Sequence, residues 1–132
     1  MKRNILRRAV VGMSAVGLSV AGLAIAPTAS AASSDCPKSY VCVWDNASFS
    51  GKPKWKSQGN LYNLKSSTGM SIFNNGTKYT GADHIGWGAT YSSGTKVSGC
   101  LHYPENGSTS GTKYTLKGSP LTLNYAKWRG EC

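Results

Sequence analysis

Four cysteines place the strongest constraint on what this chain of 132 residues can fold into. They are Cys36, Cys42, Cys100 and Cys132, and an even number in a short exported chain is typical of a disulfide framework. The chain has no Cys-x-x-Cys pair, and neither histidine lies at ligand spacing from a cysteine, so a zinc site is not indicated. We therefore expect two disulfides and no bound metal.

Four cysteines allow three pairings, and the spacing alone does not decide among them. We favour Cys36–Cys42 together with Cys100–Cys132, because the first two cysteines are close in sequence. Loop-closure entropy gives the longer bridge a stabilisation of roughly 3–4 kcal/mol, which is more than the short loop can supply.

The amino-terminal segment indicates export. Four basic residues among the first eight precede an uncharged apolar run at 9–26, and Pro27 ends that run. Ala29-Ser30-Ala31 then supplies the small residues of a cleavage site, which completes the order found in secretory signal peptides. The run also reaches the lower length limit for a membrane span, but its glycines and serines and the adjoining cleavage site favour a signal peptide over residues 1–31.

Removing residues 1–31 changes the charge and the length that matter for function. The remaining 101 of the 132 residues, 32–132, have the size of a single domain with a modest core. Four of the fifteen basic residues leave with the signal, so eleven face five acids and the net charge falls from +10 to +6. The lower charge weakens the case for a nucleic-acid partner. We expect a secreted, extracellular monomer without stable membrane insertion.

The mature chain shows no helical period, and its pattern predicts an all-β, sandwich-like domain. Glycine, serine, threonine and asparagine recur every few residues between β-branched or aromatic residues, as expected for short strands separated by turns. Asn75-Gly76 favours a type I′ hairpin turn between 71–74 and 77–80. The other expected strands lie at 40–44, 52–56, 95–97, 100–103, 113–116 and 121–125.

Two motifs near the first cysteines resemble known proteins. Trp44-x-x-x-x-Phe49-x-Gly51 resembles the first-hairpin signature of βγ-crystallin Greek keys, in which an aromatic ring packs over the hairpin and the glycine adopts a conformation closed to other residues. The segment CPKSYVCVW at 36–44 resembles the opening of peptidase inhibitor family I36, secreted actinobacterial proteins whose founding member is a Streptomyces metalloproteinase inhibitor. The likeness extends to about Asn75.

This resemblance implies a βγ-crystallin-like Greek-key sandwich that is not an enzyme and blocks an extracellular, thermolysin-like metalloprotease with a substrate-like loop. The family's reactive bond joins a cysteine to a small aliphatic residue late in the chain, which implies Cys100-Leu101, with His102 and Tyr103 beyond the bond. Cys42-Val43 is the second candidate. A neighbouring disulfide would keep such a loop rigid and limit the entropy lost on binding. The simpler interpretation is that Leu101 is a core residue of a strand.

A bound calcium ion or other cofactor is not expected. The crystallin-type calcium motif requires a hydroxyl residue at its fifth place, where Asp45–Ser50 has Phe49 and Asn74–Tyr79 has Lys78. Calcium also prefers several oxygen ligands with carboxylates among them, and the mature domain has five carboxylate side chains in all.

Two other classes of function compete with inhibition. Lys52, Lys54 and Lys56 alternate with bulky residues, so on a strand they share one face that would suit an anionic cell-wall polymer or surface. Lysines on an edge strand more often prevent sheets from associating, and Pro53 predicts such an edge.

A small ribonuclease is the third class. His102 and Glu105 would supply the acid and base, and Arg129 a phosphate contact, with Asp83 and His84 as further ionisable candidates. The simpler interpretation is that both histidines are partly exposed residues without a catalytic role.

Overall fold

The computed structural model describes residues 34–118 and 120–132, so the predicted signal peptide at 1–31 lies outside the described residues. This part of the chain contains eight strands and no helix, and hence no helix long and apolar enough to cross a membrane. The strands are β1 (Tyr40–Trp44), β2 (Trp55–Ser57), β3 (Leu61–Ser66), β4 (Met70–Asn75), β5 (His84–Tyr91), β6 (Lys96–Leu101), β7 (Lys113–Leu116) and β8 (Leu121–Arg129).

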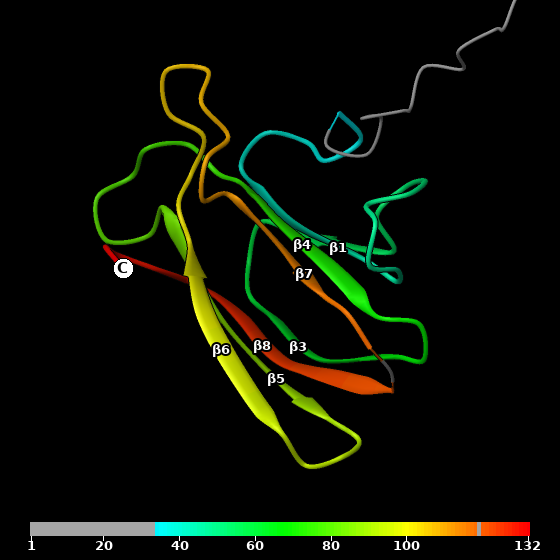
Figure 1. Cartoon of the computed structure of the whole chain (residues 1–132). Coiled ribbons are helices and arrows are strands. Elements are labelled where there is room, and N and C mark those ends of the chain that lie inside the picture. The colour runs from blue at the N-terminus through cyan, green and yellow to red at the C-terminus, as the bar shows by residue number, and fades with distance from the viewer. Residues whose placement is uncertain (1–33, 119) are drawn as a thin grey trace, which may run out of the picture.

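The strands form two four-stranded antiparallel sheets, ordered β2-β1-β4-β7 and β3-β8-β5-β6 (Figure 1). In each half of the chain the fourth strand returns to lie beside the first, and the third strand belongs to the opposite sheet. Return of the fourth strand beside the first is the closing step of a Greek key. The all-β class is therefore confirmed, whereas the finer likeness to βγ-crystallins stays a prediction.

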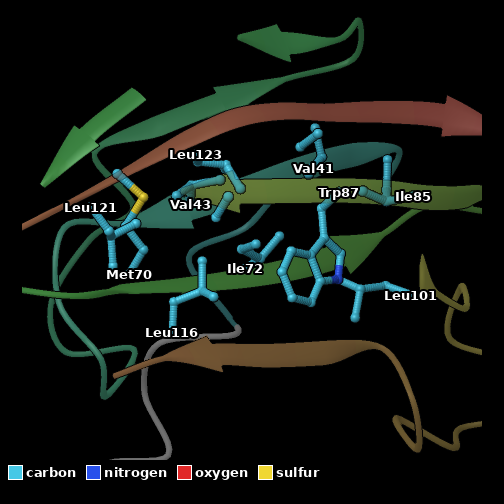
Figure 2. Close-up of a cluster of buried hydrophobic side chains, with 12 residues drawn as sticks. Val41, Val43, Met70, Ile72, Ile85, Trp87, Leu101, Leu116, Leu121 and Leu123 are labelled. Atoms are coloured by element: carbon cyan, nitrogen blue, oxygen red, sulfur yellow. The ribbon is translucent and has the colours of Figure 1, made fainter. Parts of the chain in front are cut away.

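The core lies between the two sheets and draws on both (Figure 2). Strand β1 is buried on both faces, which explains its unbroken apolar sequence: Val41 and Val43 belong to the main core, while Cys42 and Trp44 belong to a second cluster. The main core consists of Val41, Val43, Met70, Ile72, Ile85, Trp87, Ala89, Leu101, Leu116, Leu121, Leu123 and Ala126.

The folded hairpin after β1 has the local structure that its motif predicts. The rings of Trp44 and Phe49 meet edge to face with centroids 5.3 Å apart, and the indole N–H donates to the carbonyl of Gly51 at 2.8 Å. Gly51 has a φ of 69°, a left-handed conformation that glycine adopts without steric cost. The sequence therefore identified this hairpin correctly.

The central strand β5 was absent from the strands expected from sequence. Its segment His84–Tyr91 contains Gly86 and Gly88, which weaken β-propensity and concealed the pattern. Both glycines leave room for a side chain of β8, because a Cβ would lie 3.0 Å from the Arg129 side chain at Gly86 and 2.6 Å from the Tyr125 ring at Gly88.

The predicted hairpin at Asn75-Gly76 is wrong. Residues 77–80 form no strand, and Asn75 is the last residue of β4, opposite Tyr40 of β1. Neither Asn75 nor Gly76 has the positive φ that a type I′ turn requires. A Cβ at Gly76 would lie 2.8 Å from the Trp128 ring, so the glycine accommodates a tryptophan rather than a turn.

Both expected disulfides are present, Cys36–Cys42 within the second core cluster and Cys100–Cys132 joining the end of β6 to the end of the chain. The described residues contain no free cysteine. The second bridge closes a loop with a sequence separation of 32 residues, against 6 for the first, so it removes more entropy from the unfolded chain.

Replacing Cys100 and Cys132 together by alanine should lower the free energy of unfolding by about 4 kcal/mol, the value of the chain-entropy relation for this loop. Cys132 is exposed and Cys100 half-buried, so the change reports mainly on the cross-link rather than on packing. Urea unfolding monitored by tryptophan fluorescence measures it. A loss below about 1 kcal/mol would contradict the chain-entropy account of this bridge.

Candidate functional site

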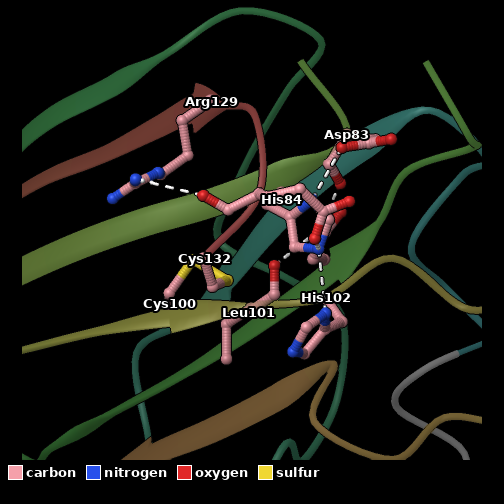
Figure 3. The surroundings of a disulfide bond; sticks show 9 residues. Asp83, His84, Cys100, Leu101, His102, Arg129 and Cys132 are labelled. Atoms are coloured by element: carbon pink, nitrogen blue, oxygen red, sulfur yellow. Dashed lines mark hydrogen bonds and ion pairs between the residues drawn. A yellow bond between two sulfur atoms is a disulfide. The ribbon is translucent and has the colours of Figure 1, made fainter. Parts of the chain in front are cut away.

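The candidate site lies at the end of β6, where the Cys100–Cys132 disulfide meets an exposed loop at 102–112 (Figures 1 and 3). The loop is closed at its base, because the N–H of His102 donates to the carbonyl of Gly111 at 3.0 Å. Near its tip, Glu105 and Ser108 form an isolated antiparallel bridge. The loop therefore projects from the domain with its own internal hydrogen bonds.

Asn74, a fully buried residue of β4, positions the segments that enter the site. Its side-chain amide donates to the carbonyls of Asp83 and Leu101, at 2.9 and 3.1 Å. Its backbone N–H donates to the carbonyl of Thr112 at 2.9 Å. One residue of the first sheet thus holds the start of β5, the end of β6 and the far end of the loop.

Three ionisable side chains, Asp83, His84 and His102, form a hydrogen-bonded series that ends at the base of the loop (Figure 3). Oδ1 of Asp83 is 2.6 Å from Nδ1 of His84, and Nε2 of His84 is 2.8 Å from Nδ1 of His102. Asp83 and His84 are 5% and 1% exposed, whereas His102 is exposed. The expectation that both histidines are partly exposed is therefore wrong for His84, because β5 carries it into the interior.

The hydrogen bonds determine which ring nitrogens of His84 and His102 carry a hydrogen when both imidazoles are neutral. An ionised carboxylate only accepts, so Nδ1 of His84 carries the hydrogen. In the neutral ring Nε2 of His84 is then an acceptor, and His102 donates to it. Burial raises the pKa of Asp83, but the hydrogen bonds from His84 and from the N–H of Tyr79 outweigh burial, so the pKa lies below the ordinary aspartate value.

Tyr103 and Glu105 lie close to His102, the exposed member of the three hydrogen-bonded side chains. The Tyr103 ring contacts His84 edge to face, with centroids 5.6 Å apart, and its hydroxyl donates to the Glu105 carboxylate at 3.3 Å. Desolvation and the negative charge of Glu105 raise the pKa of Tyr103. The phenol is therefore a neutral hydrogen-bond donor at neutral pH.

The two candidate reactive bonds lie in different settings. Leu101 is 2% exposed at the end of β6, which is an edge strand of its sheet. Val43 is fully buried in the interior strand β1, paired with β2 on one side and β4 on the other. His102 is exposed and Tyr103 half-buried, so the surface beyond Leu101 is open to a partner.

The groups proposed for a ribonuclease have other partners. His102 is bonded to His84, Glu105 accepts from Tyr103, and the Arg129 guanidinium donates to the backbone carbonyl of Glu131 at 3.1 Å. The structure therefore places the histidine in a hydrogen-bonded chain that the sequence reading did not anticipate.

The lysines considered for anionic ligands are exposed at and just before β2, which forms the edge of the β2-β1-β4-β7 sheet opposite β7. Strand β2 is an edge strand, but it begins at Trp55, so the expected strand at 52–56 is wrong and only Lys56 of the three lysines belongs to it. Lys54 pairs with Asp45 and lies over the Trp55 ring at 4.7 Å. Lys52 and Lys56 are exposed as well. A ligand for this surface stays a prediction.

The fold and the site define a small β domain, braced by two disulfides, that presents a loop anchored beside one of them. The family model described as Peptidase inhibitor family I36 matches residues 29–91. Over these residues the chain is similar to a family of peptidase inhibitors, which act by binding rather than catalysis, so the match indicates a protein that is not an enzyme. No curated protein and no solved structure matches the chain.

Replacing Asp83 with asparagine should lower stability at neutral pH and flatten its decline in acid. Because the pKa of Asp83 is lowered in the fold, its contribution is complete above the ordinary aspartate pKa of about 3.9 and is lost as pH falls through the lower folded value. Unfolding free energies between about pH 7 and 2.5 measure this dependence, with the exposed Asp35→Asn as control. Equal acid slopes in D83N and the parent would contradict it.

Proposed function

We propose that this protein is a secreted inhibitor of an extracellular metallopeptidase of the thermolysin type, and that the end of β6 and the loop at 102–112 contact the enzyme. The match to family I36 supports inhibition, and the two disulfides suit an extracellular location. The observation that carries the choice of surface is the exposed loop held at both ends beside the Cys100–Cys132 bridge.

Rigidity is the physical reason for this choice. A segment that enters a protease cleft loses conformational freedom, and a segment already ordered loses less. The base of the loop is held by the His102–Gly111 backbone bond, and its two ends are tied to β4 through Asn74. The partner would therefore meet a surface whose shape is set before binding.

Within this proposal, Cys100-Leu101 is preferred to Cys42-Val43 as the reactive bond. Leu101 ends an edge strand, so opening its backbone breaks strand pairing with β5 alone, together with the hydrogen bond from Asn74. Opening Val43 would break pairing on both sides of β1. The Leu101 side chain must still leave the core to fill a protease pocket, which makes its engagement slower than first contact at His102 and Tyr103.

Inhibition should be saturable and stoichiometric, and it should resist moderate salt because the proposed contact is not primarily electrostatic. The double variant H102A/Y103A should lose roughly tenfold or more in inhibition constant, since a few central residues dominate such interfaces. Tyr79→Ala, which removes a tyrosine that is 69% exposed elsewhere, is the matched control. Titration against thermolysin measures both; equal inhibition by H102A/Y103A and the parent would refute the proposed surface.

Prolonged incubation with the enzyme should distinguish the two candidate bonds. Cleavage at Cys100-Leu101 leaves fragments joined by the Cys100–Cys132 bridge, so they separate only after reduction. Cleavage at Cys42-Val43 leaves Cys36 and Cys42 in the same fragment, so the pieces are not covalently joined. Mass spectrometry before and after reduction should find a new amino terminus at Leu101. A first cut anywhere else would contradict the proposed bond.

A further inference from the structure

His84 and His102 are the two histidines of the chain, and the fold brings a nitrogen of each to the same point. They belong to segments 18 residues apart, one at the start of β5 and one after β6. Their rings are 4.7 Å apart between centroids and cross at 73°. Contact with a protease does not require a buried Asp83–His84 pair, so the proposed inhibition does not account for the hydrogen bonds that join Asp83, His84 and His102.

We propose that His84 and His102, with Glu131, form a binding site for a divalent transition metal of the Cu²⁺ or Ni²⁺ type. The donor atoms are Nε2 of His84, Nδ1 of His102 and Oε2 of Glu131. This site does not depend on the proposed inhibition of a protease.

The spacing of the two nitrogens favours a square-planar metal. Two donors about 2.0 Å from a metal and at right angles to each other are about 2.8 Å apart, whereas tetrahedral donors are about 3.3 Å apart. The observed separation of Nε2 and Nδ1 is 2.8 Å. This separation is that of the hydrogen bond between the rings, so a square-planar metal requires the smaller displacement of the two nitrogens. The metal would lie beside the line that joins them, about 2.0 Å from each nitrogen, and His102 would carry its hydrogen on Nε2 instead of Nδ1.

Asp83 supplies the supporting contact that metal-binding histidines usually have. A ligating histidine commonly donates its second ring N–H to a carboxylate, which fixes the tautomer and makes the free nitrogen more basic. Asp83 accepts that hydrogen bond from Nδ1 of His84 at 2.6 Å, and it is buried with it. The free electron pair of Nε2 therefore points toward Nδ1 of His102, and a small turn of both rings would direct the two electron pairs to a metal beside that line.

Glu131 completes the donor set from the end of the chain. Its Oε2 is 3.7 Å from Nε2 of His84, and its side chain is 89% exposed, so it can approach a metal at little packing cost. The bond from Arg129 to the Glu131 carbonyl and the Cys100–Cys132 bridge hold this end of the chain in place. The sulfur of Cys132 is also within 4.8 Å of both imidazole nitrogens, but it is oxidised and is not a thiolate.

Copper titration of the secreted protein, with both disulfides intact and no affinity tag, tests the site. Excess glycine in the buffer removes weakly bound copper. The parent should take up one equivalent of Cu²⁺, with an electron paramagnetic resonance spectrum that shows coupling to two imidazole nitrogens. Cu²⁺ should also raise the midpoint of thermal unfolding.

His102→Ala and His102→Asn should each lose roughly tenfold or more in copper affinity, because one of the two nitrogens that define the site is gone. Glu131→Gln should lose less, and Glu105→Gln, which removes a nearby carboxylate outside the donor set, should bind as the parent does. Thermal unfolding without copper verifies that each variant is folded. Equal copper uptake by the parent and both His102 variants, or no uptake by the parent, would overturn the proposal; equal affinity of E131Q would overturn the carboxylate's assignment.

Discussion

The buried amide of Asn74 is the contact on which the arrangement of the site depends. It lies near the end of β4 in one sheet, yet its side-chain N–H groups donate to the carbonyls of Asp83, which precedes β5, and Leu101, which ends β6, in the other sheet. Its own side-chain oxygen accepts from the N–H of Gly76. A buried amide with all of its partners present is stabilising and specific, whereas the loss of one partner leaves an unpaired polar group in the interior.

The position of the functional surface follows from that contact. Because Asn74 binds the carbonyls of Asp83 and Leu101, the residues that directly precede His84 and His102, the two imidazoles meet at one end of the sandwich. The Cys100–Cys132 bridge then brings the end of the chain to the same place. The loop, the histidine pair and the disulfide are therefore consequences of one junction between the sheets, and they need not serve one function.

Sequence reasoning succeeded where a signal was local. Two disulfides follow from an even cysteine count in a small domain that is expected to be exported, and the Trp44–Gly51 hairpin follows from an aromatic ring and a glycine at fixed spacing. It failed where a residue type serves a distant contact. Gly86 in β5 and Gly76 after β4 suggest turns or weak strands, but each leaves room for a side chain of β8.

The sequence by itself determined the all-β class, the disulfide framework and the likeness to family I36, because these depend on alternation, cysteine count and a short motif. Only the tertiary structure decided that Leu101 is buried at the end of an edge strand and that His84 lies inside beside Asp83. The physical reason is that strands far apart in sequence become neighbours through a few cross-sheet contacts. A period of two along one strand carries no information about which distant side chains will meet at its end.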